Sequence, residues 1–165
     1  MRTAEFPTRA QGLFSRLLPS VCAIILLAAS AYSLPDDPWT KEQTVQAAEF
    51  AEELQQGKDG VPVIIYVGVR ALYEGGHIPN AVYYGTGSTE QGISELKKYA
   101  EALPKSSTIV IYCGCCPVEK CPNLRPAFRA LKDDGFARLR VLILPNNFNT
   151  DWVENGYPVR KGSQP

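Results

Sequence analysis

The sequence predicts an α/β domain in which a central parallel β-sheet is flanked by helices. Short segments rich in β-branched and apolar residues alternate along the chain with longer segments whose apolar residues recur at helical spacing. The two clearest strand segments, 62–67 and 108–112, are apolar at nearly every position, as expected where both faces of a parallel sheet are covered. A chain of 165 residues with 45% hydrophobic residues also fits a single globular domain.

The first predicted helix covers 41–56. Thr40 followed by Gln43 is a capping-box pattern, and Gly57 ends the apolar stripe of this segment. The strand 62–67 follows, because its continuous run of β-branched residues is too short for a helix.

A second short strand is expected at 81–84, because turn-forming residues stand on both sides of it. Ser88 with Gln91 repeats the capping pattern and opens a predicted helix over 89–102. The strand 108–112 then leads directly into a cysteine-rich segment.

The C-terminal third of the chain predicts a helix, a strand and a final helical turn. The helix covers 122–134, because Pro122 is tolerated in a first turn and Gly135 is a stop signal. The last strand is expected at 139–144, and the short turn of helix lies around 150–154.

Residues 1–33 show the pattern of a signal peptide. Three arginines precede the uncharged run 21–31, which ends in small residues. This run is too short to cross the hydrocarbon core of a membrane, which takes roughly 20 residues, so a retained anchor is the weaker alternative. We expect cleavage after Ala31 or Ser33, which leaves 34–165 as a single domain.

The net charge of the chain and its expected compartment exclude some classes of function. The chain has 17 basic and 17 acidic residues, and cleavage after residue 33 leaves 14 against 16, a net charge near −2. Without a basic excess, no nucleic-acid partner is expected. The mature protein is expected outside the cytoplasm, periplasmic or extracellular, with no stable membrane insertion after cleavage, and disulfides persist in such a compartment. Its single histidine, His77, excludes all-histidine metal centres.

The cysteines are the main chemical resource of the mature chain. Four lie within nine positions between the strand 108–112 and the helix 122–134, and the fifth, Cys22, is lost with the signal peptide. Ligands of parallel sheets bind beyond the carboxyl ends of strands, where loop N–H groups and a helix N-terminus stabilise anions. A thiol there ionises readily and becomes a nucleophile, so Cys113 is the predicted nucleophile. The residues expected to bind substrate are Gly114, Cys115, Cys116, Pro117, Val118 and Arg125.

Three motifs, taken in order, resemble those of a known family. They are Cys113 at a strand end, the run GHIPNA at 76–81, and Trp152 followed by GYPV at 156–159. Together they resemble a rhodanese, or sulfurtransferase, domain over residues 39 to 162. The resemblance implies an α/β fold with a parallel sheet, and a Cys113 that carries sulfane sulfur as a persulfide. It implies a small anionic donor such as thiosulfate, an acceptor such as cyanide or a thiol, and no cofactor or metal.

The chain also departs from the family pattern. Cys113 and Arg125 are twelve positions apart, where about six is typical, and three further cysteines stand between them. Residues 68–70 read Gly-Val-Arg where the family usually has Asp-x-Arg, and Asn146-Asn147 replaces a double glycine. These departures concern the substrate more than the fold.

The other three loop cysteines have several interpretations. Cys115, Cys116 or Cys121 can act as a resolving thiol that forms a disulfide with Cys113, or Cys121 can pair with one of the other two as a structural disulfide. All four can instead hold a soft metal such as zinc, although their spacing differs from that of structural zinc sites. Cys121 ranks second as nucleophile, because it directly precedes the helix.

The loop cysteines also support an alternative function, and other polar residues of the chain have expected roles of their own. The alternative is a non-catalytic redox or metal-binding module, with the cysteines as a disulfide switch or metal site. His77 and Arg70 are expected to be structural, whereas Arg125 either neutralises an anionic substrate or ties the loop down.

Overall fold

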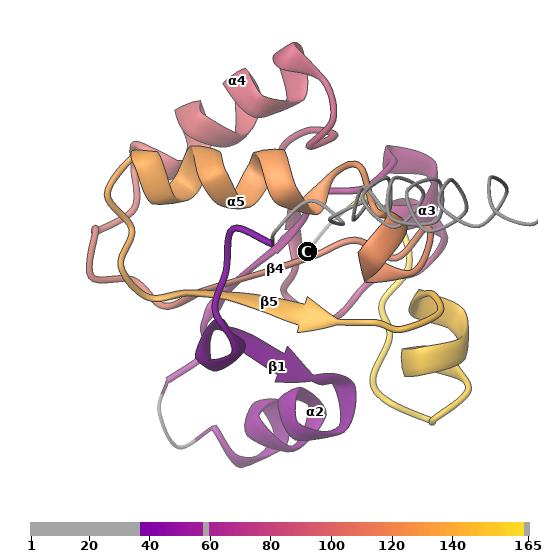
Figure 1. The fold of residues 1–165 in the computed structure, drawn as a ribbon. Helices are drawn as coiled ribbons and strands as arrows, with labels where there is room; N and C mark the ends of the chain where they lie inside the picture. The colour runs from indigo at the N-terminus through magenta and orange to yellow at the C-terminus, as the bar shows by residue number, and fades with distance from the viewer. Residues whose placement is uncertain (1–36, 58–59, 164–165) are drawn as a thin grey trace, which may run out of the picture. The chain divides into compact units, whose positions relative to one another are not determined.

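The computed structural model describes residues 37–57 and 60–163, and the predicted signal peptide lies outside them. Its centre is a sheet of five strands, all parallel, in the order β1-β5-β4-β2-β3 (Figure 1). The strands are β1 (Thr44–Gln46), β2 (Val63–Tyr66), β3 (Val82–Tyr83), β4 (Ile109–Tyr112) and β5 (Leu139–Ile143). The predicted fold class is therefore confirmed.

Helices cover both faces of this sheet. The elements are the 3₁₀ turn η1 (Lys41–Gln43), α2 (Ala47–Gln56), α3 (Arg70–Gly75), α4 (Glu90–Ala100), the 3₁₀ turn η2 (Val118–Lys120), α5 (Leu124–Asp133) and the short π-helical turn η3 (Asn149–Val153). Buried residues of α4 and α5 pack in one core cluster, and those of α2, α3 and η3 pack in another on the opposite face. In the described ranges, no helix combines the length and apolar character needed to cross a membrane.

The first predicted helix, 41–56, is wrong in its first half. The segment forms η1 and then β1, and only Ala47–Gln56 is α-helical. β1 forms because it pairs in parallel with β5 at the sheet edge and buries Val45, which is 1% exposed. Tertiary pairing therefore overrides the helical spacing of this segment.

Two helix starts also differ from the prediction. Thr89, not Ser88, caps α4, since its hydroxyl oxygen accepts a hydrogen bond of 3.0 Å from the backbone of Gly92. α5 begins at Leu124 rather than Pro122, and residues 122 and 123 form a turn before it. The helix α3 was not predicted.

The central strand β4 aims Cys113 at one face of the sheet. Ile109 and Ile111 point toward α4 and α5, and Cys113 continues this alternation into the same core cluster. The chain leaves β2 toward β3 and returns to β4 on the other side of β2, so the strand order reverses between β2 and β4. Ligands of parallel sheets bind beside such a point, which is where Cys113 lies.

Candidate functional site

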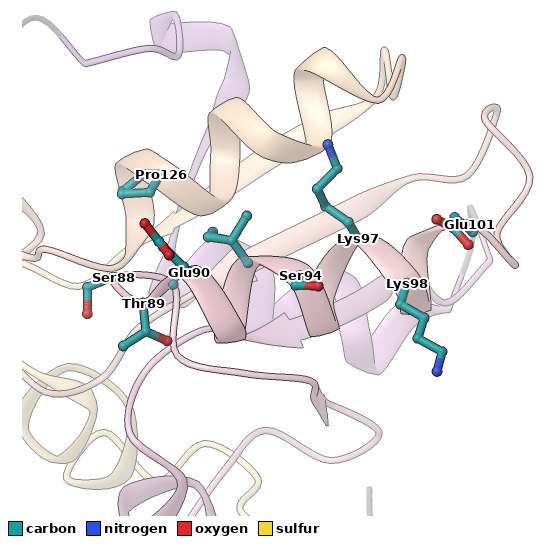
Figure 2. Close-up of a pocket in the computed structure, with 10 residues that line it drawn as sticks. Ser88, Thr89, Glu90, Ser94, Lys97, Lys98, Glu101 and Pro126 are labelled. Carbon is teal, nitrogen blue, oxygen red and sulfur yellow. The ribbon is translucent and has the colours of Figure 1, made fainter.

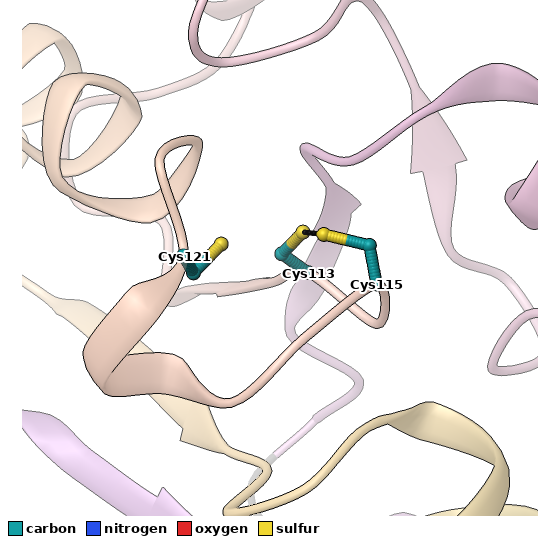
Figure 3. A group of neighbouring side chains, drawn as sticks. All are labelled: Cys113, Cys115 and Cys121. Atoms are coloured by element: carbon teal, nitrogen blue, oxygen red, sulfur yellow. Dashed lines mark hydrogen bonds between the residues drawn. The ribbon is translucent and has the colours of Figure 1, made fainter.

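Three sulfur atoms meet at the carboxyl end of β4. Cys113, Cys115 and Cys121, here called the cysteine trio, have Sγ atoms that all lie within 4.8 Å of one another. The Sγ atoms of Cys113 and Cys115 are 3.3 Å apart, and Figure 3 shows that of Cys121 pointing toward Cys113 from the other side. Cys116 extends the row, with its Sγ 3.2 Å from that of Cys115, and all four thiols are free.

Cys113 is a buried thiol to which several hydrogen-bond donors point. Its pKa is lowered to about 6, mainly because the Cys121 thiol donates to its sulfur. Burial opposes this shift, since Cys113 is 1% exposed, but the N–H of Cys115 and the side-chain amide of Asn123, at 3.4 Å, add to it. Cys113 is therefore the member of the trio that ionises most readily.

The other two thiols of the trio hold their protons. The pKa of Cys121 is raised, first by its hydrogen bond to Cys113 and then by burial. The pKa of Cys115 is raised to about 12 by desolvation and by its sulfur neighbours, Cys116 and Cys113. Within the trio, the pKa of Cys113 is therefore lowered, whereas the pKa values of Cys115 and Cys121 are raised.

The backbone donors of the loop are shared between two sulfurs. The N–H of Cys115 addresses Cys113, whereas the N–H groups of Asn123 and Leu124, at the start of α5, address Cys121. The N–H of Val118 bonds instead to the carbonyl oxygen of Leu144. Among residues 114–118, which were expected to bind substrate, the backbone of Cys115 lowers the pKa of Cys113.

Gly114 holds the loop against the C-terminal part of the chain. Its carbonyl oxygen accepts a hydrogen bond of 3.1 Å from the N–H of Phe148. A Cβ atom at Gly114 would lie 2.5 Å from Cβ of Phe148, closer than real contacts allow. Glycine is therefore required between Cys113 and Cys115.

Arg125 makes the contacts of a residue that ties the loop down. Its guanidinium donates to the carbonyl oxygens of Val118 and Cys121, at 3.4 and 3.3 Å, and lies 2.6 Å from the carboxylate of Asp37. These partners all belong to the protein, so the charge of Arg125 is balanced within the fold.

A pocket of about 470 Å³ opens beside the trio. Gly114, Cys115, Tyr66 and Lys161 are among the residues that line it. Tyr66 is 1% exposed, and its hydroxyl has no hydrogen-bond partner among the residues the structure describes. Burial raises the pKa of this hydroxyl, so it remains a neutral donor.

Sequence reasoning missed Tyr66. It ends β2 opposite Tyr112 in the parallel register, so it lies at the same carboxyl edge of the sheet as Cys113, which follows β4. A Cβ atom at Gly68 would lie 2.4 Å from the Tyr66 hydroxyl and 3.0 Å from Sγ of Cys113. The sequence feature that could have identified Tyr66 is therefore its place at the end of β2, the strand that neighbours β4 in the sheet.

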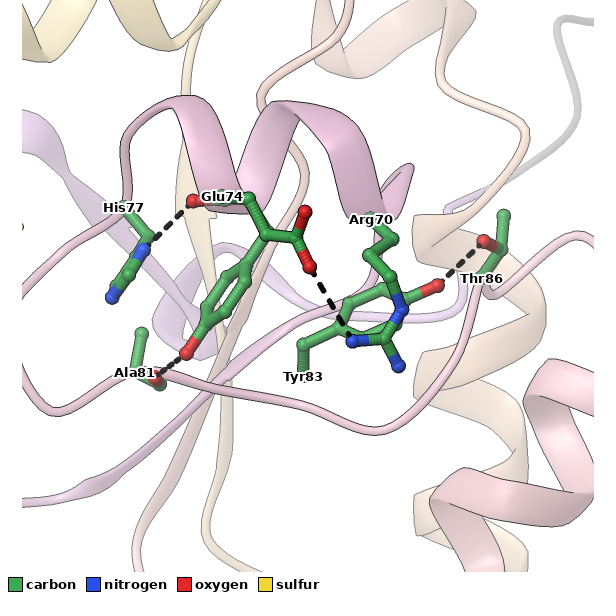
Figure 4. Close-up of polar contacts among 7 residues, drawn as sticks. Arg70, Glu74, His77, Ala81, Tyr83 and Thr86 are labelled. Atoms are coloured by element: carbon green, nitrogen blue, oxygen red, sulfur yellow. Dashed lines mark hydrogen bonds and ion pairs between the residues drawn. The ribbon is translucent and has the colours of Figure 1, made fainter. Parts of the chain in front are cut away.

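His77 and Arg70 make structural contacts. His77 is fully buried, its Nδ1 lies 2.7 Å from the carbonyl oxygen of Tyr73, and its ring stacks on that tyrosine (Figure 4). Arg70 lies 3.7 Å from the carboxylate of Glu74 and over the ring of Tyr83 (Figure 4). Both residues order the segment that joins β2 to β3.

A wider groove of about 790 Å³ runs along α4 (Figure 2). It is lined by polar residues and Ile93 of α4, by the turn before that helix and by Pro126, and none of the four loop cysteines contributes to it. Lys97, one of its two lysines, pairs with Asp134 at 2.8 Å. The groove is therefore separate from the sulfur chemistry.

Comparisons with known proteins agree with this architecture. The family model described as "Rhodanese-like domain" matches residues 46–143. No curated protein matches the chain. Solved structures similar to it include the rhodanese-like domain of an Anabaena protein, at 21% identity and a TM-score of 0.54, which covers 73% of this chain and 80% of that one.

Two further structures show the same likeness. A Bacillus halodurans protein is 21% identical, with a TM-score of 0.56, over 73% of this chain and 77% of that one. A thiosulfate sulfurtransferase from Pseudomonas aeruginosa is 18% identical, with a TM-score of 0.51, over 73% of this chain and 20% of that one. At these identities the likeness establishes the fold.

Proposed function

Because the chain belongs to the rhodanese-like domain family, we propose that it is a sulfurtransferase or sulfur carrier that moves sulfane sulfur through a persulfide on Cys113. One observation carries the proposal: the buried sulfur of Cys113 accepts a hydrogen bond of 3.4 Å from the Asn123 amide and lies 3.3 Å from the Cys115 thiol, with the Cys121 sulfur within 4.8 Å. Such donors stabilise a thiolate, which is the nucleophilic form of cysteine. They equally stabilise the negative charge of a persulfide.

The loading step needs no cofactor. The Cys113 thiolate attacks the sulfane sulfur of a small anionic donor such as thiosulfate, the S–S bond of the donor breaks, and sulfite leaves with its electron pair. A new S–S bond then joins Cys113 to the transferred sulfur, which carries the negative charge. A thiol acceptor takes that sulfur in the second half of the reaction.

The sulfur donor can reach the site through the pocket beside the trio. The Tyr66 hydroxyl can donate to a donor oxygen, and Lys161 at the exposed rim supplies positive charge. Cys115 is the cysteine that faces this pocket, and rotation of its exposed side chain gives access to Cys113 behind it.

Intact mass spectrometry of the reduced protein tests the proposal. Thiosulfate should add about 32 Da to the protein, at least transiently, because one sulfur atom joins a thiol. Cys113→Ser should abolish the adduct, and Cys116→Ser, which removes a thiol outside the trio, should retain it. An adduct that survives in Cys113→Ser would contradict the assignment of Cys113.

One observation favours a second candidate function. Three thiol ligands within 4.8 Å of one another suit a soft metal ion, for which cysteine is the preferred ligand. The metal content of the purified protein distinguishes the two functions. A stoichiometric metal that is lost in Cys115→Ser, together with the absence of a thiosulfate adduct, would establish a metal site instead.

We also propose that the protein is exported. The charge and apolar pattern of residues 1–33 supports this proposal. Mass analysis of the protein from the expressing cells should give a mature chain that begins at Tyr32 or Leu34. A full-length chain that remains in the cytoplasm would contradict it.

A further inference from the structure

We propose that Cys115 resolves the Cys113 persulfide, so that the protein releases the transferred sulfur as hydrogen sulfide and retains a Cys113–Cys115 disulfide. This step rests on the proposed function, because it begins from a persulfide on Cys113. It adds an activity, the reduction of sulfane sulfur to sulfide at the expense of a dithiol.

Proximity makes Cys115 the first acceptor that the persulfide meets. Its Sγ lies 3.3 Å from that of Cys113, within the range of a near-attack geometry. The Asn123 amide holds the pair together, since its nitrogen is 3.4 Å from Cys113 Sγ and 4.0 Å from Cys115 Sγ. Well-oriented groups of one molecule react as though present at ~10⁵ M or more, far above any thiol in solution.

The separation of the two sulfurs also selects which sulfur is attacked. Transfer of the outer sulfur from Cys113 to Cys115 needs three sulfurs in line, which puts the two Sγ atoms at least ~4.1 Å apart, twice the S–S bond length. Attack on Cys113 Sγ itself only requires the pair to close from 3.3 Å to the length of a disulfide, ~2.05 Å. The observed distance therefore favours disulfide formation with loss of the outer sulfur.

The backbone holds this arrangement in place. Gly114 lies between the two cysteines, and its carbonyl oxygen is bonded to the N–H of Phe148. Because Phe148 also leaves no room for a side chain at Gly114, it constrains the turn that brings the sulfurs together through both its backbone and its side chain.

The step balances without any group from outside the protein. The proton of the Cys115 thiol passes to the outer sulfur of the persulfide, the resulting Cys115 thiolate attacks Cys113 Sγ, and the bond from Cys113 to the outer sulfur breaks as that sulfur leaves as HS⁻. The sulfane sulfur gains two electrons, and the two cysteines lose them as they form the disulfide. An external dithiol then restores both thiols by attack on Cys115, the exposed end of the disulfide.

A single-turnover experiment tests the inference. The fully reduced mature protein is mixed anaerobically with thiosulfate and no other thiol, and released sulfide and intact mass are followed together. The wild type should release one sulfide per chain and become ~2 Da lighter, with a Cys113–Cys115 crosslink in the peptide map. Cys115→Ser should keep a stable adduct of ~32 Da on Cys113 and release sulfide ~100-fold more slowly or not at all.

The neighbouring thiol supplies the matched control. Cys116→Ser keeps both reacting sulfurs, so it should still release sulfide and form the Cys113–Cys115 crosslink, and its rate measures how far the Cys116 sulfur, 3.2 Å from that of Cys115, affects the attack. Wild-type sulfide release by Cys115→Ser, a persulfide that accumulates on wild-type Cys113, or a persulfide that maps to Cys115 would each overturn the inference while the sulfurtransferase stands. If Cys115→Ser acquires no adduct on Cys113, the proposed function fails and the inference fails with it.

Discussion

The side-chain amide of Asn123 donates to the sulfur of Cys113 from 3.4 Å, while its carbonyl oxygen accepts a hydrogen bond from the backbone N–H of Ser88. Asn123 is 2% exposed, so the amide is fixed in this position. One buried residue thus couples the reactive sulfur to the start of α4.

Replacement of Asn123 should therefore weaken the nucleophile. Asn123→Ala removes a donor to the Cys113 thiolate, and a hydrogen bond to a charged group is worth about 1.5–3 kcal/mol. We expect thiosulfate loading at pH 6 to slow roughly 10-fold, measured from the release of sulfite. Asn123→Gln, which keeps the amide on a longer arm, should recover part of the rate, and equal loss in both variants would indicate a purely structural role.

The pH dependence of loading should report the hydrogen bond from Cys121. With the pKa of Cys113 near 6, the wild-type rate should rise through that pH and level off above it. Cys121→Ala removes the main cause of the lowered pKa, so the midpoint should move up toward the ordinary thiol value of about 8.5. Stopped-flow thiolate absorbance or rates of Cys113 alkylation measure both curves.

Cys121→Ser is the control for this prediction. A serine hydroxyl still donates to Cys113, so the profile should stay close to that of the wild type. A profile that is the same in Cys121→Ala and the wild type would show that Cys121 does not set the ionisation of Cys113.

The unpartnered hydroxyl of Tyr66 should matter for the donor and not for stability. Tyr66→Phe removes a buried polar atom without a partner, so the free energy of unfolding should be unchanged or slightly higher. The KM for thiosulfate should rise roughly 5-fold or more if the hydroxyl binds the donor.

A second buried tyrosine, Tyr112, should matter for stability and not for donor binding. Tyr112→Phe breaks a hydrogen bond of 3.0 Å from the N–H of Ile78, which should lower stability by about 1 kcal/mol and leave the KM unchanged. If the two variants change the KM equally, Tyr66 has no special role in donor binding.

A methyl group at Gly114 should displace the cysteine loop. Gly114→Ala places a Cβ atom 2.5 Å from that of Phe148, and overpacking of this kind typically costs about 1–3 kcal/mol. The Tm should fall by roughly 5 °C, and sulfide release should be lost with the geometry of the cysteine pair. Gly75→Ala is the control, because nothing lies within 4 Å of a Cβ atom there, and thermal unfolding of both variants provides the comparison.

The sequence was sufficient to predict that Cys113 follows a central strand, but not the contacts that the loop cysteines make with one another. The apolar run before Cys113 predicted a central strand, and a strand end followed by a helix predicted the anion-stabilising loop. By contrast, β1 was hidden within a helical pattern, because three residues at a sheet edge leave almost no periodic signal.

The partners inside the loop were beyond prediction for a related reason. The bond of Asn123 to Ser88 spans 35 positions, and the contacts of Arg125 with Asp37 and of Gly114 with Phe148 join segments that only the folded sheet brings together. Asn80 of the GHIPNA run has a φ of 65°, a conformation that asparagine tolerates better than most residues and that the sequence did not reveal.

The pairing of Arg125 with Asp37 has a practical consequence for anyone who expresses a shortened form of this protein. The family match begins at residue 46 and ends at 143, so a fragment cut to those limits lacks both Asp37 and Phe148, which brace the cysteine loop from opposite ends of the chain. It also lacks Trp39, whose ring packs edge-on against Phe128 of α5. Such a fragment would retain every cysteine of the loop but lose Asp37 and Phe148, which hold the loop in place. A fragment that spans 37–163 keeps the cysteines and both of these residues.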